Sequence, residues 1–485
     1  MAPAFFCVGR FGAAAAAWRR SGFGRAPDET KQKGDAMRIL IYGLNYAPEV
    51  TGVGKYTAEM AELLVARGHE VRVVSAQPYY PQWRVHDGYR AWRYRHETWH
   101  GVPVWRAPLW VPSRPGGLKR IVHLASFALL SLPLLVRQAP WRPQVLMLIA
   151  PTLACAPGAL ALARLVGAHA WLHIQDFEVD AAFDLGLLQG GGASRIARAA
   201  HAAERALLRS FDVVSSISVR MVERAIDKGV DASRAMCLPN WVDIRAIFPL
   251  PEPSMFRRRL GIAADSIVVL YAGSMGAKQG IEILADVATA LADRRDIRFV
   301  FCGDGAARRE LMTRCAPLAN CHVLPVQPAE WLNALLNVAD IHVLPQRNDA
   351  ADLVMPSKLT GMLASGRAVV AMARPGTCLF DVVSDHGIVV PPEDSAALAA
   401  AIVTLAGDPA RRATLGRAAR QYAQRMLSPQ SIFGALEARL AALTGGDAAP
   451  AAGPQQPAGS AAPAARKSGT SGKALQEVEQ SDAGT

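Results

Sequence analysis

Residues 349–371 read DAADLVMPSKLTGMLASGRAVVA and join a loop, a helix start and a strand. Pro356 suits the first turn of a helix, because its missing N–H would have no intrahelical partner there, and Ser357 and Lys358 add a hydroxyl and a cation to that turn. Unpaired N–H groups and the positive end of the helix dipole favour an anion at this point. Gly366 ends the helix before the strand AVVAM begins. Open parallel sheets hold ligands at loops of this kind, so the stretch predicts an anion site; an ordinary surface loop is the alternative.

Short apolar runs alternate with amphipathic ones along the rest of the chain, in two sets. The runs that we predict as strands are 38–44, 70–75, 145–150, 169–174 and 212–217 in the first set, and 267–271, 297–302, 322–325, 340–344, 368–372 and 387–390 in the second. Alternation of this kind predicts parallel sheets with right-handed crossovers. The expected fold class is therefore α/β, with two doubly wound, Rossmann-like parallel-sheet domains joined by the proline-rich linker 240–252.

The 485 residues, 51% of them hydrophobic, are too many for a single core. We expect one domain at 37–240, a second at 241–424, and a C-terminal helix at 425–444 that packs back on the first domain. Residues 1–36 lack the long apolar segment and cleavage site of a secretory signal, so we interpret them as a disordered extension or the result of a misplaced start codon. Residues 445–485 contain almost no large apolar side chain and are predicted to be disordered.

The basic balance of the chain does not point to nucleic acid. Although the formal net charge is +12, the basic residues are spread along the sequence and no winged-helix, RRM or zinc-finger pattern accompanies them. We therefore expect no nucleic-acid partner. The seven cysteines form no CxxC pair and no zinc spacing, which is typical of reduced thiols in the cytoplasm.

Each half of the chain carries a glycine loop after its first predicted strand. The loops read NYAPEVTGVGKY and YAGSMGAKQG. Neither matches GxGxxG or GxxxxGK[ST], so each alone is weak support for a phosphate site. Two such loops, together with the turn at Pro356–Lys358, predict a diphosphate bound in a cleft between the domains. The loop residues expected to contact it are Gly52, Gly54, Gly276 and Lys278.

Polar residues also follow the strand predicted at 169–174, in the sequence HIQDFEVD. They come at its carboxyl end, where parallel sheets bind ligands. His173 falls between the two glycine loops, so we favour a functional role for it and for Asp176 over a structural one.

Aromatic residues crowd one short region of the first half. Their faces suit sugar stacking or a lipid interface, and packing within a small hairpin is the alternative. The residues are Tyr79, Tyr80, Trp83, Trp92, Trp99, Trp105 and Trp110.

Residues 121–136 contain no charged side chain and follow the pair Lys119 and Arg120. The segment is shorter than the roughly 18–20 residues that span a bilayer, and Pro133 interrupts it. We predict a helix that dips into a membrane surface, with Leu129 and Leu130 on its apolar side. A buried crossover helix of the first sheet is the alternative.

The combination of these motifs resembles glycosyltransferase family 4 of the GT-B fold. The resemblance runs from about Met37 to Leu443 through PEVTGVGKYTAEMAELLVARGHEV, PYYPQW, HIQDFEVD, GSMGAKQG and MPSKLTGMLASGRAVV. Within that family the chain is most similar to WcaI-type transferases of colanic acid and other bacterial exopolysaccharides. The combination is far more specific than any single motif.

The resemblance implies roles for the two domains and for several residues. The N-terminal domain would bind the acceptor and the C-terminal domain the nucleotide-sugar donor. Gly52 and Gly54 would lie under the donor diphosphate, Lys278 would neutralise it, and His173 would lie near the donor sugar. Acceptor or membrane contacts would come from Tyr79, Tyr80, Trp83, Leu129 and Leu130.

The sequence departs from the family pattern at two places. The arginine that usually comes about five residues before the lysine is missing, since Ser274 and its neighbours offer none. The pair of glutamates seven residues apart is also absent, because its second position is Gly361. Asp352, with Pro356, is the candidate for ribose or sugar recognition in place of that pair.

The chemistry that the resemblance implies needs no metal. Lysine and backbone N–H groups can stabilise the charge that develops on a leaving diphosphate. No Asp-x-Asp pair occurs in the sequence, which argues against a Mg²⁺- or Mn²⁺-dependent transferase of the other common fold. We expect no metal and no cofactor beyond the nucleotide-sugar substrate, and we assign no general base.

The predicted function is a retaining, metal-independent glycosyltransferase. It would move a sugar from a nucleotide sugar, such as GDP-fucose or GDP-mannose, to an oligosaccharide linked to polyprenyl diphosphate. The expected location is the inner face of the cytoplasmic membrane, as a peripheral protein. A GT-B nucleotide-sugar epimerase and a non-catalytic nucleotide-sugar-binding protein are the alternatives.

Overall fold

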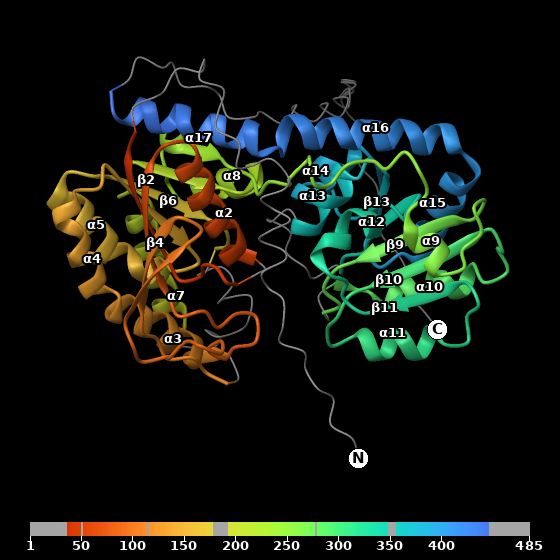
Figure 1. Ribbon diagram of the computed structural model, residues 1–485, viewed down its shortest axis with the longest axis horizontal. Helices are drawn as coiled ribbons and strands as arrows, with labels where there is room; N and C mark the ends of the chain where they lie inside the picture. Colours follow the sequence, from red (N-terminus) through yellow and green to blue (C-terminus); the bar gives the residue numbers. More distant parts are fainter. Residues whose placement is uncertain are drawn as a thin grey trace, which may run out of the picture. The chain divides into compact units, whose positions relative to one another are not determined.

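The computed structural model describes residues 36–49, 52–113, 116–177, 193–276, 279–347 and 356–445. Within them the chain forms two sheets, one from each half of the sequence, and helices accompany both (Figure 1). All strand neighbours are parallel except one pair, which confirms the predicted α/β class with two parallel-sheet domains. The segments predicted to be disordered lie almost wholly in 1–35 and 446–485, outside the described residues.

The first sheet has eight strands in the order β3-β4-β2-β1-β5-β6-β7-β8. The strands are β1 (Arg38–Gly43), β2 (Glu70–Ala76), β3 (Arg95–Trp99), β4 (Val102–Ala107), β5 (Val145–Ala150), β6 (His169–Ile174), β7 (Val213–Ser216) and β8 (Ala235–Cys237). The helices are α2 (Gly52–Ala66), α3 (Gly117–Leu130), α4 (Leu132–Gln138), α5 (Ala156–Val166), α7 (Ala193–Leu208) and α8 (Val219–Asp227). Only β3 and β4 pair antiparallel.

The central strands of this sheet are buried because both of their faces are covered. Successive side chains of a strand point to opposite faces. Accordingly, Leu40 and Tyr42 of β1 lie in one core cluster, whereas Ile39 and Ile41 lie in another. Strands covered on both faces read as continuous apolar runs, which is why the sequence located β1, β5 and β6 well.

The second sheet has six strands in the order β11-β10-β9-β12-β13-β14. They are β9 (Ile267–Ala272), β10 (Ile297–Cys302), β11 (Cys321–Leu324), β12 (Ile341–Leu344), β13 (Ala368–Met372) and β14 (Ile388–Val390). The helices are α9 (Met255–Arg259), α10 (Glu282–Ala290), α11 (Arg308–Cys315), α12 (Leu332–Leu336), α13 (Ser357–Ala364), α14 (Cys378–Ser384) and α15 (Ser395–Gly407).

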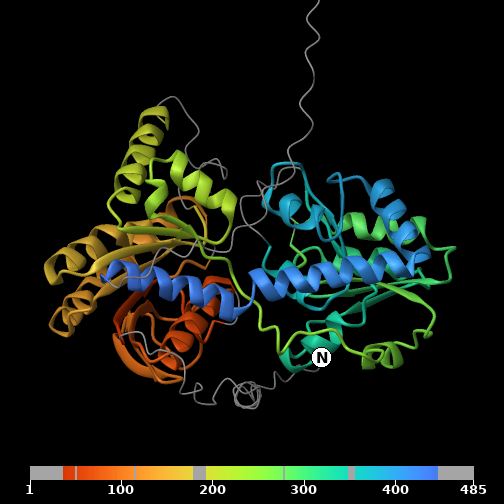
Figure 2. The ribbon, with the colours of Figure 1, turned by 90° about the horizontal axis from the view of Figure 1, so that it is seen from above.

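Two further helices connect the second sheet with the first. Helix α16 (Pro409–Met426) packs against α13 and β13. Helix α17 (Pro429–Leu443) follows it, and Phe433 and Leu436 of α17 lie in the core cluster that contains Ile39 and Ile41. Figures 1 and 2 show the two helices, in blue, running one after the other past both sheets. The end of the described chain therefore contributes to the core of the first domain.

Strands β3 and β4, which form an antiparallel hairpin, were not among the strands predicted from the sequence. Strand β3 is largely exposed and contains only one large apolar residue, so it lacks the buried run that marks the other strands. Trp99 and Trp105 belong to this hairpin, as in the alternative interpretation of the aromatic region. Strand β8 was also missed, because it has three residues and none of them is fully buried.

One helical run of the described residues, Lys119–Trp141, is long and apolar enough to cross a membrane by length and composition alone. It covers 23 residues, more than the predicted segment, and 39% of its most apolar window is buried. The run is not one continuous helix. Helix α3 ends at Ser131, and α4 begins with Pro133 in its first turn.

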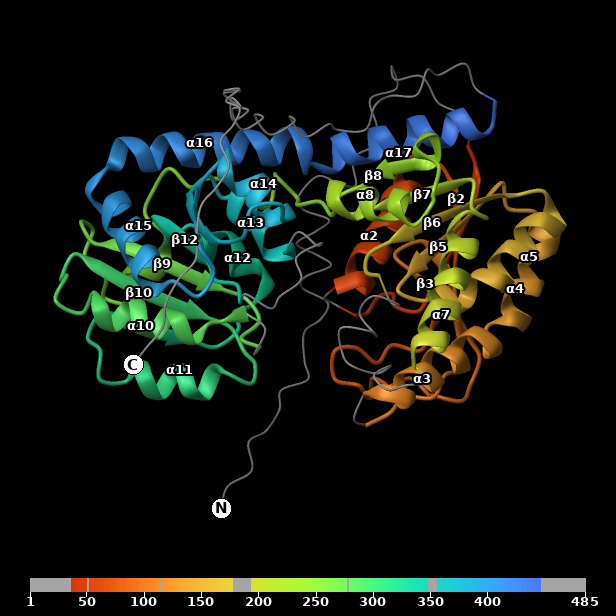
Figure 3. The ribbon, with the colours of Figure 1, turned by 180° about the vertical axis from the view of Figure 1, so that it is seen from behind.

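The two sides of this run differ in burial. Phe127 and Leu134 lie in a core cluster of the first domain. In contrast, Leu129 and Val136 are each 67% exposed, and Leu130 is partly buried. Figure 3 shows α3, α4 and α5 at the margin of the first domain. The segment is thus a core helix on one side and an exposed apolar surface on the other.

Candidate functional site

The chain order of the second sheet locates its ligand-binding edge. From β9 the chain proceeds to β10 and β11 on one side and then to β12, β13 and β14 on the other. The loops that follow β9 and β12 therefore diverge at a topological switch point, where open α/β sheets bind ligands. The loop after β9 contains Gly273 and Gly276, and the segment after β12 leads to α13.

The side chain of Lys358, from the first turn of α13, lies against the loop after β9. Its Nζ donates a hydrogen bond to the hydroxyl of Tyr271 at 2.9 Å and lies 4.7 Å from the centre of that ring. A Cβ on Gly273 would be 3.3 Å from Lys358 Cε, and the φ of Gly273 is +149°, which also favours glycine. The two predicted anion-binding elements therefore meet through this lysine.

The local environment makes the Lys358 ammonium available for an anion. Burial lowers the pKa of Lys358 to about 8, because the charged form loses hydration. Among the described residues, no carboxylate contributes to that shift. An anion such as a diphosphate would compensate for the lost hydration and raise the pKa again.

The helix start beside Lys358 adds backbone donors. Pro356 is the N-cap residue and provides no side-chain hydrogen bond to the first turn of α13. The first N–H groups of a helix have no intrahelical acceptor, so those of Ser357 and Lys358 can bind an anion. Ser357 is exposed and Pro356 is partly exposed.

The structure describes only some of the other residues that were predicted to bind the nucleotide-sugar donor. Gly276 is partly buried, and a Cβ there would lie 2.8 Å from Gln279 Oε1. Lys278 and Asp352 lie outside the described residues. Sequence reasoning missed Tyr271 and also Gly303, whose Cβ would clash with Gly273 O at 1.9 Å. The GDG pattern after β10 was the available signal for Gly303, whereas Tyr271 looked like an ordinary strand residue.

The glycine loop of the first domain has a different interior. A Cβ on Gly54 would lie 2.7 Å from Glu49 Oε2, so this glycine makes room for a carboxylate of the protein. Gly52 begins α2 with a φ of +61°, and a Cβ there would contact only Tyr80, at 3.9 Å. The contact of Gly52 and Gly54 with a diphosphate stays a prediction. The group that packs closely against Gly54 in the structure is the side chain of Glu49.

Glu49 is a buried hub that the sequence did not reveal. It is 3% exposed. The N–H groups of Tyr79 and Tyr80 both donate to its Oε1 at 3.0 Å, and Asn45 Nδ2 donates to its Oε2 at 2.9 Å. Burial raises the pKa of Glu49, although these hydrogen bonds oppose the rise. Glu49 thereby fixes the start of the aromatic loop 79–94 against the glycine loop.

His173 lies in a closed hydrogen-bond network at the carboxyl end of β6. Its ring is 1% exposed. Gln175 Nε2 donates to His173 Nε2 at 3.0 Å, so Nδ1 carries the proton and donates to Ser215 Oγ at 2.9 Å. Gln175 and Asn240 also bond to each other through both amide groups, at 3.1 Å.

This network limits what His173 can do chemically. Burial lowers its pKa to about 4, so the imidazole stays neutral near pH 7. Both ring nitrogens already have partners, so contact with a donor sugar would require Gln175 to move. The amide pair joins β6 to Asn240, where the linker between the two sheets begins.

The predicted residues Asp176, Tyr79 and Tyr80 differ in how deeply they are buried. Asp176 is exposed, immediately after β6. Tyr79 is buried, with its ring centre 4.8 Å from that of His123 and 5.4 Å from that of Trp83. Tyr80 is exposed. Among the described residues, no group of three or more His, Cys, Asp or Glu side chains could hold a metal ion.

Comparisons with known proteins show the family of the chain. Residues 51–241 match the model of the glycosyl transferase 4-like domain, and residues 266–408 match that of the glycosyl transferases group 1. The chain is 42% identical over 407 residues to the putative colanic acid biosynthesis glycosyl transferase WcaI of Escherichia coli (strain K12). That alignment covers 82% of this chain and 98% of the relative.

Solved structures share the fold at lower identity. Sucrose-phosphate synthase from Thermosynechococcus elongatus superposes with a TM-score of 0.64 and 20% identity, over 84% of this chain and 99% of the other. Anabaena Alr3699/HepE, solved in complex with UDP and glucose, gives a TM-score of 0.58 and 17% identity, over 84% and 100%. At these identities the likeness concerns the fold alone.

Proposed function

Because the chain belongs to glycosyltransferase family 4 of the GT-B fold, we propose that it transfers a sugar from a nucleotide diphosphate sugar to a lipid-linked oligosaccharide in bacterial exopolysaccharide synthesis. The acceptor would be carried on polyprenyl diphosphate, and GDP-fucose and GDP-mannose are the first donors to test. The identity with WcaI over nearly its full length supports colanic acid or a similar polymer as the product. The UDP complex of Alr3699/HepE supports a nucleotide-sugar donor.

The observation that carries this proposal is the position of Lys358. Its ammonium lies against the Gly273 loop at the switch point of the second sheet, beside the uncapped start of α13. A leaving nucleoside diphosphate gains negative charge in the transition state. A fixed cation and N–H groups directed at that charge lower the barrier. Lys358 would thus supply the cation that the family usually places in the loop before Lys278.

The proposed mechanism assigns few further roles. The donor would bind with its diphosphate at Gly276, Ser357 and Lys358, and Lys278 would add a second cation. Transfer would proceed with retention by attack from the face that the diphosphate leaves, without a metal ion. Given its low pKa, His173 would act as a neutral contact for the donor sugar and not as a proton carrier. Asp176 is a candidate contact at the same strand end, and Asp352 stays a candidate for ribose.

We also propose that the first domain binds the inner face of the cytoplasmic membrane. The exposed side of α3 and α4 presents Ile121, Leu129 and Val136, and Lys119 is an exposed cation at its start. Apolar helices flanked by cations bind anionic membrane surfaces. Such attachment brings the acceptor domain to a lipid-linked substrate.

The donor is tested by thermal unfolding with a panel of nucleoside diphosphates. A ligand at ~100 times its dissociation constant stabilises the folded protein by roughly 2.7 kcal/mol. We expect one nucleobase to give the largest shift and Lys358→Ala to abolish it. If no nucleoside diphosphate raises the unfolding temperature, the protein is not an enzyme that uses a nucleotide sugar.

The reaction is tested by incubating the cognate sugar donor with a lipid extract, with and without EDTA. We expect labelled sugar to appear in the lipid fraction at the same rate in both samples. An epimerase would alter the free donor instead, and a non-catalytic binding protein would alter nothing. A requirement for added Mn²⁺ would contradict the metal-independent mechanism.

The membrane proposal is tested with the double variant Leu129→Ser/Val136→Ser, because both side chains are exposed. We expect it to move from the membrane fraction to the soluble fraction with its unfolding temperature unchanged. Leu134 is unsuitable for this purpose, since it belongs to the core. Met312→Ser, which changes an exposed apolar residue of α11, is the matched control. A double variant that stays with the membrane as the parent does would contradict the proposal.

A further inference from the structure

A pocket lies in the first domain, apart from the donor loops. It has a volume of about 270 Å³ and is formed by the segments that follow β2 and β4. Strand β4 pairs parallel with β2, and β2 pairs parallel with β1, so the site lies on the same edge of the sheet as the first glycine loop. Its lining residues are Trp83, Arg84, Val85, Ala91, Trp92, Leu109, Trp110, Val111 and Ser113.

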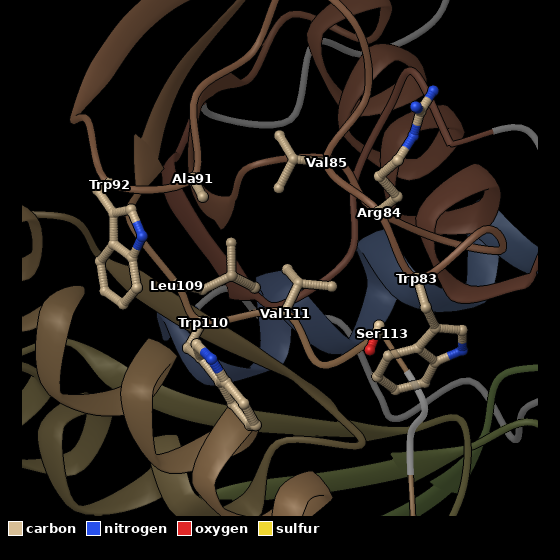
Figure 4. A pocket seen from close by; sticks show the side chains of 9 residues that line it. All are labelled: Trp83, Arg84, Val85, Ala91, Trp92, Leu109, Trp110, Val111 and Ser113. Atoms are coloured by element: carbon tan, nitrogen blue, oxygen red, sulfur yellow. The ribbon is translucent and has the colours of Figure 1, made fainter.

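The interior of this pocket is aliphatic. Figure 4 shows Val85, Ala91, Leu109 and Val111 around its centre, with the tryptophans and Arg84 further out. Leu109 is fully buried and belongs to the core of the domain. A sugar ring needs several hydrogen-bonding partners, which these four side chains cannot provide. A branched hydrocarbon chain needs none, so the interior favours a lipid over a sugar.

The pocket is formed before any ligand binds. The N–H of Leu109 donates to Ala91 O at 3.0 Å and joins its two segments. Trp110 is fixed to α3 by both of its backbone groups, since its N–H donates to Ser126 Oγ at 3.0 Å and its carbonyl accepts from His123 Nδ1 at 2.6 Å. Trp83 has a φ of +53°, an unusual conformation for a bulky residue that functional sites often retain.

Cations border the aliphatic interior. Arg84 lies at the rim and is largely exposed. Burial raises the pKa of Tyr79 and lowers that of His123, and the charge of Arg120, near the start of α3, opposes the first shift and adds to the second. The rings of Tyr79 and His123 in turn contact Trp83 of the pocket wall. An apolar pocket with two arginines beside it matches a hydrocarbon chain with an anionic head.

The surface around the pocket continues the same character. Ile121 and Val122, in the first turns of α3, are exposed apolar residues close in sequence to Arg120. At about 270 Å³ the pocket is smaller than the roughly 300–1,000 Å³ of sites that enclose a whole drug-sized ligand. It therefore suits one part of a larger molecule whose remainder lies along the surface.

We propose that this pocket binds the isoprenoid units next to the diphosphate of the acceptor lipid, and that Arg84 and Arg120 bind that diphosphate. This assignment depends on the proposed function, since it identifies the lipid part of the acceptor as a recognised group. The pocket would hold the lipid by its first units and so fix how far the attached sugar extends from the first domain toward the donor.

The test uses the full chain with farnesyl diphosphate as the probe and inorganic diphosphate as its head-group control, measured by calorimetry. Ala91→Phe fills the pocket, and Trp92→Ala removes a wall residue that is 65% exposed and so does not support the core. We expect each variant to weaken farnesyl diphosphate binding at least tenfold and to change inorganic diphosphate binding less than twofold. Met312→Ala, in the second domain, should change neither.

Kinetics with two acceptors separates this proposal from the function itself. In both pocket variants we expect a higher KM for a lipid-linked acceptor, with kcat and the donor KM unchanged. A water-soluble acceptor without the isoprenoid should show no change. If both variants bind farnesyl diphosphate as tightly as the parent does, the pocket assignment is wrong. It is also wrong if the variants lose the ability to bind a lipid-free oligosaccharide. Pocket-dependent farnesyl diphosphate binding without any sugar transfer would overturn the proposed function alone.

Discussion

In the first domain the glycine loop after β1 encloses the carboxylate of Glu49, whereas in the second the loop after β9 lies against the ammonium of Lys358. Both loops follow the first strand of a parallel sheet and precede a helix, and both contain closely spaced glycines. In each loop the glycine is needed because a side chain packs closely against the backbone, that of Glu49 at Gly54 and that of Lys358 at Gly273. The charge of the enclosed group affects whether an external anion is attracted or repelled, so the interior of the second loop favours a phosphate more than that of the first, where the contact of Gly52 and Gly54 stays a prediction.

The lysines near the two loops differ in the same way. Lys55 follows Gly54 directly, but its side chain is 44% exposed and its Nζ lies 3.8 Å from Glu59 Oε1. Lys358 comes from a helix that lies far along the chain from its loop, and no carboxylate in the described part of the chain shifts its pKa. Proximity in sequence to a glycine loop therefore does not decide whether a lysine side chain contacts that loop.

The largest expected effect is the loss of transfer in Lys358→Ala. We expect kcat/KM for the donor to fall at least on the order of a hundredfold, because the leaving diphosphate loses a fixed cation. Lys55→Ala, the matched control, should stay within a few-fold of the parent. Unchanged circular dichroism would show that both variants fold. If the two lysines prove equally important, or equally dispensable, the contrast between the loops is wrong.

Lys278→Ala also tests how a cation stabilises the leaving diphosphate in the transition state. The residue lies outside the described part of the chain, so this expectation comes from its sequence position. We expect a similar, roughly hundredfold fall in rate with the fold intact. Activity within a few-fold of the parent would remove Lys278 from the proposed site and leave Lys358 as its cation.

Glu49 tests the other loop through stability. Glu49→Ala leaves the N–H groups of Tyr79 and Tyr80 without their acceptor, and we expect the free energy of unfolding to fall by about 2 kcal/mol. Glu49→Gln keeps one carbonyl oxygen and should cost less than half as much. Urea denaturation measures both. Equal stability of the alanine and glutamine variants would show that Glu49 is not the structural hub of the first loop.

The sequence predicted the sheets better than it predicted the site. Strands such as β5, β6 and β10 were located to the residue, because a strand covered on both faces is a short, uninterrupted apolar run. Strand β3 lies at the edge of the first sheet and is largely exposed, so its apolar signal is weak.

The site was predictable only where local rules apply. Lys358 was identified because the proline, the serine and the lysine fall in one helical turn. The partnership of Lys358 with Tyr271, and that of Glu49 with Gly54 and the Tyr79–Tyr80 backbone, depend on which loops meet at a sheet edge. His173 looked like a cleft residue because of its place after a strand, and the closed network with Ser215 and Gln175 could not be inferred from sequence order.

A pH profile sharpens the contrast between the two loops at a smaller scale. The pKa of Lys358 is lowered to about 8, so the ammonium is lost as pH rises through that value. We expect kcat/KM for the donor to fall about tenfold between pH 7 and pH 9, since this parameter follows the free enzyme. Lys358→Arg, which cannot lose its proton in this range, should flatten the profile if it retains activity. A profile that is flat in the parent would contradict the role of the ammonium.

The smallest expected effect concerns the contact between the domains that carry the two loops. Arg220 of α8 donates to Asp381 of α14 at 2.8 Å, and the two side chains are 36% and 33% exposed. Partly exposed ion pairs contribute about 1 kcal/mol or less, and salt screens them. A double-mutant cycle with Arg220→Ala and Asp381→Ala should therefore give a coupling free energy below about 1 kcal/mol, both in urea denaturation and in the donor KM.

The two readouts of that cycle have different meanings for the loops. Coupling in stability alone would indicate a contact that merely joins the domains. Coupling in the donor KM as well would indicate that the contact affects how the second loop meets its ligand, even though Arg220 belongs to the first domain. Arg220 also lies 3.2 Å from Glu223 on its own helix, so Glu223→Ala is the control for changes within α8. A coupling free energy above about 2 kcal/mol would mean that the two loops do not act independently. The ion pair between the domains would then also affect how the second loop binds its ligand.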